Sequence, residues 1–242
     1  MIDVEAAGDV RVVSIDRDER RNALDVAHCE ALRRSIDDCA SAGARAVVVT
    51  GRGRAFCAGA DFGEVGDGRF RGALYAALRQ VAGAPVPVVA AVNGPAIGAG
   101  LQLAIACDLR VAAPEARFSL PSARLGLAVD PWTIRRLVSL AGAGTTAALM
   151  LACADLTADQ AMGAGLAERA GGLDAAVAVA TGIASCAPLT LAYSKRVIQS
   201  LAGGHVDEQA ISAAFDACWA SADLAEGLRA RSQRRPPRFE GR

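Results

Sequence analysis

The sequence has few of the residues on which common cofactor and metal sites depend. It contains one lysine, Lys195, and two histidines, His28 and His205, among 242 residues. A phosphate-binding loop of the pattern GxxxxGK[ST] is therefore absent, and no GxSxG nucleophile motif occurs. A histidine-based triad or metal site would have to use one of the two histidines. His28 lies beside Cys29 near an expected helix start, where a structural or surface role is the better interpretation. The sequence thus argues against nucleotide hydrolysis and metal-dependent catalysis.

The chain also lacks an excess of charge of either sign, because 26 basic residues balance 26 acidic ones. This balance argues against a general nucleic-acid or membrane-surface binder. The sequence begins without a basic and apolar leader, and glycine, proline or charge interrupts every apolar stretch before it could span a bilayer. The seven cysteines include no CxxC pair, so we expect buried free thiols in a reducing compartment. These features predict a cytoplasmic globular protein with no membrane span and no nucleic-acid partner.

The first half of the sequence alternates strand-like and helix-like segments. Uninterrupted β-branched runs such as Ala46–Thr50 are typical of strands that are buried on both faces. From Trp132 onward the pattern is almost wholly helical. The alternation predicts an α/β fold with parallel βαβ units, followed by a helical C-terminal portion. The expected strands and helices of the first part are 10–15, 26–40, 46–50, 70–82, 88–92, 99–106 and 108–112.

Two glycine-flanked turns follow buried strands, at 51–61 and 93–102. Small residues let a ligand approach the backbone, and a helix beginning near Ala99 leaves unpaired N–H groups at its positive end. Two such groups aimed at one oxygen atom would form an oxyanion hole. The same glycines also suit tight strand-to-helix turns without a ligand, so the residues alone leave both interpretations open. The second turn is not a dinucleotide-binding loop, because position 103 is leucine where that fingerprint has its third glycine.

Three segments taken together resemble the signatures of the enoyl-CoA hydratase/isomerase (crotonase) family. Arg20–Leu24 is similar to its P-x-x-N-A-L segment, Phe56–Asp61 to its F-x-A-G-A-D segment, and Asn93–Asp108 to its N-G-x-A-x-G-G-G…C-D segment. The resemblance is collinear over essentially the whole chain. It implies an α/β crotonase (ClpP-like) spiral of ββα turns over residues 1–185 and a helical trimerisation region over residues 186–242. It further implies a homotrimer or dimer of trimers and an acyl-CoA thioester ligand.

The resemblance also implies roles for individual residues. The backbone N–H groups of Ala60 and Ala99 correspond to the family's oxyanion hole, which holds the thioester carbonyl oxygen. We expect no metal and no separate cofactor, because coenzyme A enters as part of the ligand. For most of the C-terminal arginines, a solvated helix end is an equally good interpretation. Six positions match CoA-binding residues of the family: Arg20, Arg21, Ala23, Ala58, Phe215 and Arg234. In the family, the positions of Phe215 and Arg234 reach the ligand of a neighbouring subunit.

The sequence departs from the family at both of its catalytic glutamates. Gln102 stands three residues after Ala99, and Ser122 follows Pro121. Neither an amide nor a hydroxyl group exchanges protons as a carboxyl group does near neutral pH. Gln102 can still form hydrogen bonds to water or to a thioester. We therefore expect an acyl-CoA-binding protein of fatty-acid or lipid metabolism with little or no ordinary hydratase activity.

Asp130 is a carboxylate that remains near these positions in the sequence. Some family members, among them dienoyl-CoA isomerases and aroyl-CoA dehalogenases, have a working aspartate in this region. The alternative function is therefore an enzyme, a lyase, isomerase or thioester hydrolase that uses Asp130. Asp130 followed by Pro131 is also the pattern of a helix N-cap with proline in the first turn. A carboxylate that points into a pocket beside Ala60 and Ala99 would favour catalysis, and one bonded to N–H groups of its own helix would favour the cap. A protein without any small-molecule ligand is a third interpretation, and it leaves the small-residue turns unexplained.

Overall fold

A six-stranded sheet forms the centre of the protein. The computed structural model describes residues 1–61, 63, 68–201 and 207–242. β1 is antiparallel to β2, whereas the other neighbouring strands of this sheet are parallel. The strands, in spatial order, are β1 (Ile2–Ala7), β2 (Val10–Ile15), β3 (Ala46–Gly51), β4 (Val88–Val92), β6 (Leu109–Ala112) and β9 (Arg169–Ala170). The four predicted strands and the parallel βαβ arrangement are thus confirmed, and β1 and β9 are additions at the two edges.

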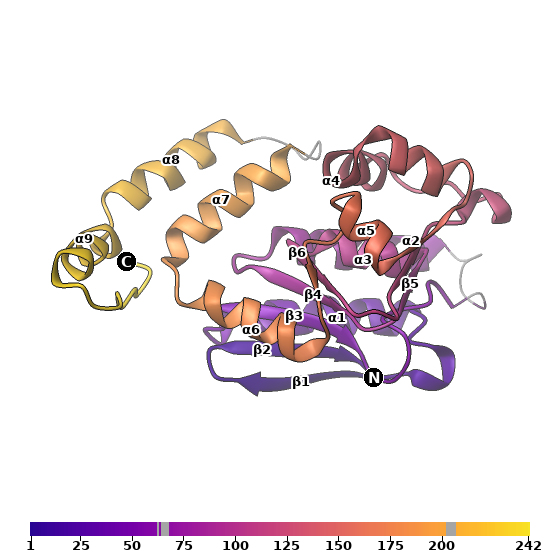
Figure 1. Ribbon diagram of the computed structural model, residues 1–242, viewed down its shortest axis with the longest axis horizontal. Coiled ribbons are helices and arrows are strands. Elements are labelled where there is room, and N and C mark those ends of the chain that lie inside the picture. The colour runs from indigo at the N-terminus through magenta and orange to yellow at the C-terminus, as the bar shows by residue number, and fades with distance from the viewer. Residues whose placement is uncertain (62, 64–67, 202–206) are drawn as a thin grey trace.

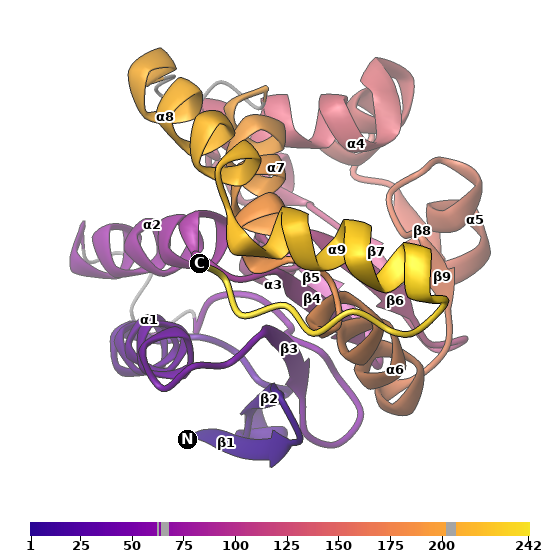
Figure 2. The same cartoon turned by 90° about the vertical axis from the view of Figure 1, so that its left-hand side faces the viewer.

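Helices cover both faces of this sheet, which explains the β-branched strands. α1 (Val26–Ser41) and α2 (Gly68–Gly83) lie on one face, and α6 (Leu173–Ala184) lies on the other (Figure 2). Along β3, Val47 and Val49 pack in the core beneath α1 and α2, whereas Val48 packs in the core beneath α6. Each fully buried valine contributes about 1.5–3 kcal/mol relative to an exposed one, so β3 is fixed from both sides.

A second, three-stranded sheet consists of β5 (Pro95–Ile97), β7 (Arg117–Ser119) and β8 (Asp155–Thr157). Successive units of the chain contribute one strand to the large sheet, one to the small sheet and then a helix. These units are β4, β5 and α3 (Ala99–Ala106), and then β6, β7 and α4 (Pro131–Met150) after a short 3-10 helix at Ser122–Leu125. This repeat is the spiral of ββα turns that the resemblance implies. Isolated parallel bridges, Leu24 to Ala60 and Cys57 to Ala96, extend the same arrangement to the earlier turns of the spiral.

The C-terminal part is helical, as predicted, and extends away from the large sheet (Figure 1). It comprises α7 (Pro188–Ser200), α8 (Glu208–Trp219) and α9 (Ala222–Gln233). The helical prediction from Trp132 onward is correct for α4, α5 (Ala158–Gly163) and α6 through α9, and it misses β8 and β9, which are too short to show a period. The expected boundary between residues 185 and 186 falls between α6 and α7. His205 lies outside the described residues.

Within the described ranges, no single helix is long and apolar enough to cross a membrane. α6 and α7 taken as a pair reach the required length and composition, but they are bent by 113° relative to one another.

All seven cysteines are free, and five of them are buried. Burial raises the pKa of the Cys57 and Cys107 thiols to about 12, so neither forms a thiolate near neutral pH. The prediction of buried thiols is wrong for Cys186, which is exposed, and for Cys218, which is half-buried, because both lie on the outlying C-terminal part.

Candidate functional site

A cavity of about 200 Å³ lies where the two predicted turns meet. One wall comes from the turn after β3, a second from the start of α3, and the remainder from α2 and from the segment between β7 and α4. The residues that line it are Ala58, Gly59, Ala60, Phe70, Arg71, Leu74, Tyr75, Ile97, Gly98, Ala99, Gln102, Leu120, Pro121, Ser122, Leu125, Leu127, Ala128 and Val129. The structure therefore brings Ala58, Ala60 and Ala99 together with Gln102 and Ser122.

Close backbone contact holds the two turns side by side. Cys57 N donates to Pro95 O at 3.1 Å, and Ile97 N donates to Cys57 O at 3.0 Å. A side chain at Gly100 would place its Cβ 2.0 Å from Cys57 O, so only glycine allows α3 to begin this close to the first turn. A Cβ at Gly59 would likewise lie 3.1 Å from Ile97 O and 4.0 Å from Ala99 N. The glycines thus allow the two turns to pack backbone against backbone, and the close approach of a ligand to these turns stays a prediction.

The backbone amides of Ala60 and Ala99, both in this cavity wall, have no hydrogen-bond partner within the part of the chain that the structure describes. Leu24 N donates to Gly59 O at 2.8 Å, and Asp61 N donates to Leu24 O at 2.7 Å. Because the bonds to Leu24 are made by the residues on either side of Ala60, the N–H group of Ala60 points away from Leu24. Ala99 is the first residue of α3, where an N–H group has no partner within the helix. Among the described residues, neither the Ala60 nor the Ala99 amide donates a hydrogen bond. Both residues line the same cavity.

Arg17 fixes the first turn from the opposite side, a role that no sequence pattern indicates. Its guanidinium lies 2.9 Å from Asp61 Oδ2 and 3.1 Å from Asp25 Oδ2. A hydrogen bond from Gly63 N lowers the pKa of Asp61, burial opposes the shift, and Arg17 adds to it. Asp25 is also the N-cap of α1, where it accepts from the backbone and ring of His28. The Arg17 guanidinium therefore ties the turn beside Ala60 to the start of α1, and His28 has a local structural contact.

The loop that resembles the family's first CoA-binding segment packs against the cavity wall. Ala58 N donates to Arg21 O at 2.9 Å, and Arg17 Nη1 donates to Ala23 O at 3.1 Å. Asn22 is fully buried with a φ of 59°, and its amide nitrogen donates to Arg52 O and Ala55 O. The side chains of Arg20 and Arg21 are exposed. The structure thus places Arg20, Arg21 and Ala23 beside Ala58, with two guanidinium groups facing solvent.

Phe215 and Arg234 lie away from this cavity of the same chain. The Phe215 ring is 5.8 Å from that of Tyr193 and 6.2 Å from that of Trp219, in a separate cavity of about 470 Å³ between α7, α8 and α9. Arg234 is exposed at the end of α9 with a φ of 52°. The structure therefore does not join these two residues to Ala58 within one subunit.

Gln102 begins a buried chain of hydrogen bonds that ends at Asp130. Gln102 Nε2 donates to Thr133 Oγ1 at 2.9 Å, and Thr133 Oγ1 donates to Asp130 Oδ1 at 2.5 Å. Thr133 is fully buried and Gln102 is 4% exposed. Thr133 was not singled out in the sequence, although its spacing of three residues from Asp130 places both on one side of the first turn of α4. Ser122 is also buried, at the start of the 3-10 helix that leads toward α4.

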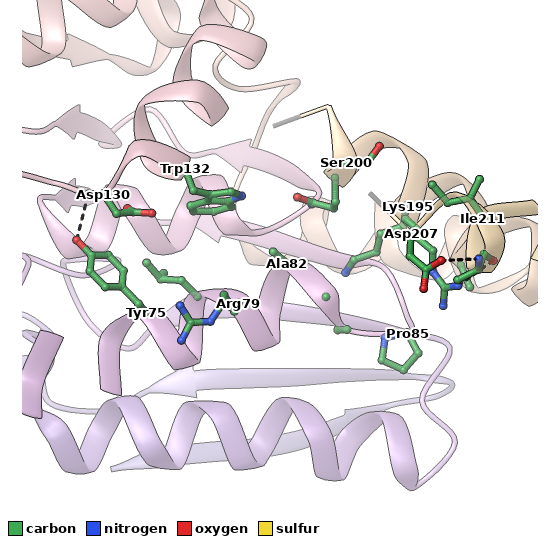
Figure 3. Close-up of a pocket in the computed structure, with 17 residues that line it drawn as sticks. Tyr75, Arg79, Ala82, Pro85, Asp130, Trp132, Lys195, Ser200, Asp207 and Ile211 are labelled. Atoms are coloured by element: carbon green, nitrogen blue, oxygen red, sulfur yellow. Dashed lines mark hydrogen bonds between the residues drawn. The ribbon is translucent and has the colours of Figure 1, made fainter. Parts of the chain in front are cut away.

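Asp130 occupies the predicted N-cap position of α4, with Pro131 at the first helical position. Its carboxylate makes no cap bond to the backbone of that helix and accepts from the Thr133 hydroxyl instead. Its own N–H donates to Tyr75 Oη at 3.2 Å (Figure 3). Asp130 lines a larger cavity of about 720 Å³, in which Trp132 and Arg79 lie near one end and Lys195 and Asp207 near the other (Figure 3). Tyr75 lines both this cavity and the smaller one.

Two buried arginines fix the far end of α3. Arg110 Nη1 and Arg136 Nη2 both donate to Cys107 O, at 3.0 and 3.3 Å. Arg136 Nε also donates to Ile105 O at 3.0 Å, and Arg110 forms an ion pair with Glu168. Burial first, and the neighbouring Arg110 second, lower the pKa of Arg136. The cations satisfy carbonyl groups at the negative end of α3, whose other end carries the free Ala99 amide.

No aspartate or glutamate lines the 200 Å³ cavity among the residues that the structure describes. The same residues contain no cluster of three or more histidine, cysteine or acidic side chains suited to a metal ion. The polar side chains that line this cavity are those of Arg71, Tyr75, Gln102 and Ser122.

Residues 5–242 match the enoyl-CoA hydratase/isomerase family. The chain is 44% identical over 244 residues to a Mycobacterium tuberculosis protein named enoyl-CoA hydratase echA6, and the match covers 100% of both chains. A solved structure of an enoyl-CoA hydratase/isomerase family protein from Hyphomonas neptunium superposes with a TM-score of 0.90 at 30% identity, covering 100% of this chain and 98% of that one. For an enoyl-CoA hydratase from Bacillus anthracis the TM-score is 0.89 at 31% identity, with coverage of 100% and 99%. The chain belongs to the enoyl-CoA hydratase/isomerase family, whose members bind acyl-CoA thioesters, and it has the crotonase fold of that family.

Proposed function

We propose that this protein binds acyl-CoA thioesters with the thioester carbonyl oxygen between the amides of Ala60 and Ala99. The observation that carries the proposal is a small cavity in which these two amides have no partner among the described residues and lie beside Gln102 and Ser122. A backbone N–H group without a partner in the protein is available to a ligand acceptor. A carbonyl oxygen is the acceptor that two convergent N–H groups suit, and the Ala99 amide adds the positive end of α3.

The proposed activity is binding with little or no ordinary hydration, in the fatty-acid or lipid metabolism of the cytoplasm. Water addition to an enoyl thioester needs groups that take up and deliver protons near neutral pH. Gln102 and Ser122 stand where the family has its two glutamates, and neither side chain can perform that exchange. Two free amides without an acid–base pair fit a protein that holds a thioester.

The CoA portion and the assembly form a second part of the proposal. Arg20 and Arg21 extend into solvent beside Ala58, where cations can meet the phosphates of CoA. Phe215 and Arg234 are proposed to serve a neighbouring subunit, which agrees with their distance from the cavity of their own chain. Residues 186–242 are proposed as the trimerisation region of a homotrimer or dimer of trimers. Trp219 is 67% exposed there and Leu228 is 63% exposed, and such apolar surface favours a protein contact.

The test is calorimetric titration of the protein with butyryl-CoA, together with an assay of crotonyl-CoA hydration. Ala99→Pro removes one proposed donor, and proline suits the first position of a helix, so α3 should survive. Glu208→Pro makes the same exchange at the first position of α8 and is the matched control. We expect Ala99→Pro to weaken binding about tenfold, because one hydrogen bond to the ligand is lost, and Glu208→Pro to leave binding unchanged. Equal binding by both variants, or hydration at an ordinary enzymatic kcat of about 1–10³ per second, would contradict the proposal.

A second candidate function is enolate chemistry in which Asp130 acts as an acid or base. It is favoured by Asp130, which lines the larger cavity and whose carboxylate oxygen Oδ2 accepts no hydrogen bond within the described ranges. In this case Asp130→Asn should abolish turnover of an acyl-CoA while leaving its binding intact. Unchanged turnover in that variant would remove this candidate.

A further inference from the structure

Tyr75 and Arg79 of α2 carry hydrogen-bond donors that have no acceptor among the described residues. Tyr75 Oη accepts from Asp130 N at 3.2 Å, so the hydroxyl proton of Tyr75 remains to be donated. Arg79 is exposed and forms no hydrogen bond or ion pair with any residue that the structure describes. Its guanidinium group has N–H donors on all three nitrogen atoms and no acceptor. Both side chains are therefore open to an acceptor on a ligand.

The spacing of Tyr75 and Arg79 lets them reach the same group. Residues four apart on a helix are neighbours, and side chains lean toward the helix N-terminus, so the Arg79 side chain extends toward Tyr75. Both residues line the cavity of about 720 Å³, and Figure 3 shows them near the same end of it. A carboxylate is the acceptor that a phenol O–H and a guanidinium group suit together, because it accepts several hydrogen bonds and has the opposite charge.

The two other cations that line this cavity already have partners. Lys195 Nζ lies 2.8 Å from Asp108 Oδ2, and it also donates to Val86 O at 3.0 Å. Arg196 Nη1 donates to the carbonyl oxygen of Ala210 at 3.2 Å. Among the described residues of this cavity, a cation free to bind an anion is thus found at the Tyr75 end.

Tyr75 also separates this cavity from the small one, since it lines both. A cavity of about 200 Å³ is about 6 Å across, a distance that four carbon–carbon bonds of about 1.5 Å span. An acyl chain whose carbonyl oxygen lies at the amides of Ala60 and Ala99 therefore reaches Tyr75 with about its fifth or sixth carbon.

We infer that the site binds CoA thioesters of dicarboxylic acids of about five or six carbons, and that Tyr75 and Arg79 hold the far carboxylate. The inference rests on the proposed thioester site. An alkyl chain of the same length offers no acceptor to either side chain, so it forgoes both charge-assisted and neutral hydrogen bonds there. Asp130 lines the same cavity, and its negative charge opposes a second carboxylate.

The test is calorimetric titration with two pairs of ligands, adipoyl-CoA with hexanoyl-CoA and glutaryl-CoA with pentanoyl-CoA. The members of a pair have the same number of acyl carbons and differ in the terminal carboxylate. For the wild-type protein we expect the dicarboxylic member of at least one pair to bind about fivefold more tightly, because the guanidinium group of Arg79 is partly screened by solvent. The ratio of the two affinities in that pair is the quantity compared among variants.

Substitutions at the two donors should change this ratio and leave the affinity for the alkyl ligand within about twofold. Arg79→Gln removes the cation and should bring the ratio close to one. Tyr75→Phe keeps the ring and should lower the ratio about twofold, the loss of one neutral hydrogen bond. Asp130→Asn removes the opposing charge and should raise the ratio about twofold. Arg33→Gln makes the same exchange as Arg79→Gln at an exposed position of α1 and is the matched control.

Arg71 tests whether the far carboxylate lies at the other end of this face of α2. It precedes Tyr75 by four residues, lines the small cavity, and forms no hydrogen bond or ion pair with a described residue. Since its side chain leans away from Tyr75, Arg71→Gln should keep the ratio. A ratio that falls in Arg71→Gln and not in Arg79→Gln would overturn the inference.

The remaining outcomes separate this inference from the proposed function. If the wild-type protein binds both members of each pair equally, the thioester site stands and the inference is wrong. A ratio that survives Arg79→Gln, or that falls in Asp130→Asn, also overturns it. If none of the four ligands binds the wild-type protein, the proposed function itself fails. Circular dichroism identifies a variant that does not fold, and Tyr75→Phe decides the question if Arg79→Gln is such a variant.

Discussion

Arg17 reaches Asp61 across the sequence, with its Nη2 atom 2.9 Å from the Oδ2 atom of that carboxylate. Asp61 directly follows Ala60, whose amide is one of the two donors that we propose for the ligand oxygen. The same guanidinium contacts Asp25 at the start of α1, so the turn is held against a long helix. Rigid support of this kind decides whether two donors converge on one oxygen, because small displacements weaken both hydrogen bonds.

Replacement of Arg17 should therefore weaken ligand binding without removing any group that touches the ligand. We expect Arg17→Ala to lower the affinity for butyryl-CoA about tenfold, since charge-assisted hydrogen bonds are among the stronger ones. Arg33→Ala removes an exposed arginine from α1 and is the control, with an expected change of less than about twofold. Calorimetric titration of the two variants measures the difference. Equal affinities would show that the turn keeps its shape without Arg17.

The contact between Gly100 and Cys57 predicts opposite effects for the same substitution at two helical glycines. Gly100→Ala places a Cβ 2.0 Å from Cys57 O and should destabilise the protein by about 1–3 kcal/mol, because the neighbour is backbone and must move. Gly144 lies on the exposed side of α4, where an added Cβ would meet no atom within 4 Å, so Gly144→Ala should stabilise by about 0.5–1 kcal/mol. Urea unfolding of both variants measures the sign of each change in the free energy of unfolding. A stabilising Gly100→Ala would mean that α3 is not pressed against the first turn.

The sequence predicted the parts of the site that depend on local pattern. Val88–Val92 reads as a buried strand because its run is unbroken, and α3 begins and ends at the expected residues, Ala99 and Ala106. The two small-residue turns beside these elements were found for the same reason. An apolar run, or an alternation of apolar and polar residues, is visible within one segment of the sequence, without any knowledge of the segments that pack against it.

The parts that depend on contacts between distant segments were not predictable. Arg17 lies in a polar turn with nothing to distinguish its guanidinium from that of Arg20, and its partner Asp61 comes 44 positions later. Thr133 could have been noticed through its spacing from Asp130, but its second partner, Gln102, is 31 positions away. Tertiary packing alone brings such side chains together, so the chain from Gln102 to Asp130 is a result of the structure.

The ion pair between Glu226 and Arg235 predicts a pH dependence at the C-terminal end of the chain. The hydrogen bond from Arg235, and then that from Arg238 N, lower the pKa of Glu226 to about 2 from its ordinary 4.5. A lowered pKa means that the contact stabilises the folded state fully above pH 4.5, and that this contribution is lost as the pH falls toward 2. NMR titration of the Glu226 carboxyl group should thus give a midpoint near 2. Arg235→Ala should move the midpoint toward 4.5, and Arg229→Ala, which removes a weaker contact at 3.4 Å, should move it much less. A midpoint near 4.5 in the unmodified chain would mean that the pair does not form in solution.

Carboxyl groups at positions 102 and 122, which we match to the family's glutamates by resemblance, provide a strict test of the binding proposal. Gln102→Glu alone supplies one proton-exchanging group, and Ser122→Glu alone supplies the other, so neither should raise crotonyl-CoA hydration above the wild-type level. The double variant should gain about 10²-fold, the lower range for general acid–base catalysis, because both proton transfers are then possible. Thr133 limits the gain to that range. Its hydroxyl group has a single proton, and the new carboxylate at position 102 must compete for this proton with Asp130. The loss of the enoyl absorbance measures the rate, and butyryl-CoA titration shows whether each variant still binds. Full hydratase activity in a single variant would mean that another group already performs one of the two proton transfers. The proposal that this cavity has no acid–base chemistry would then be wrong.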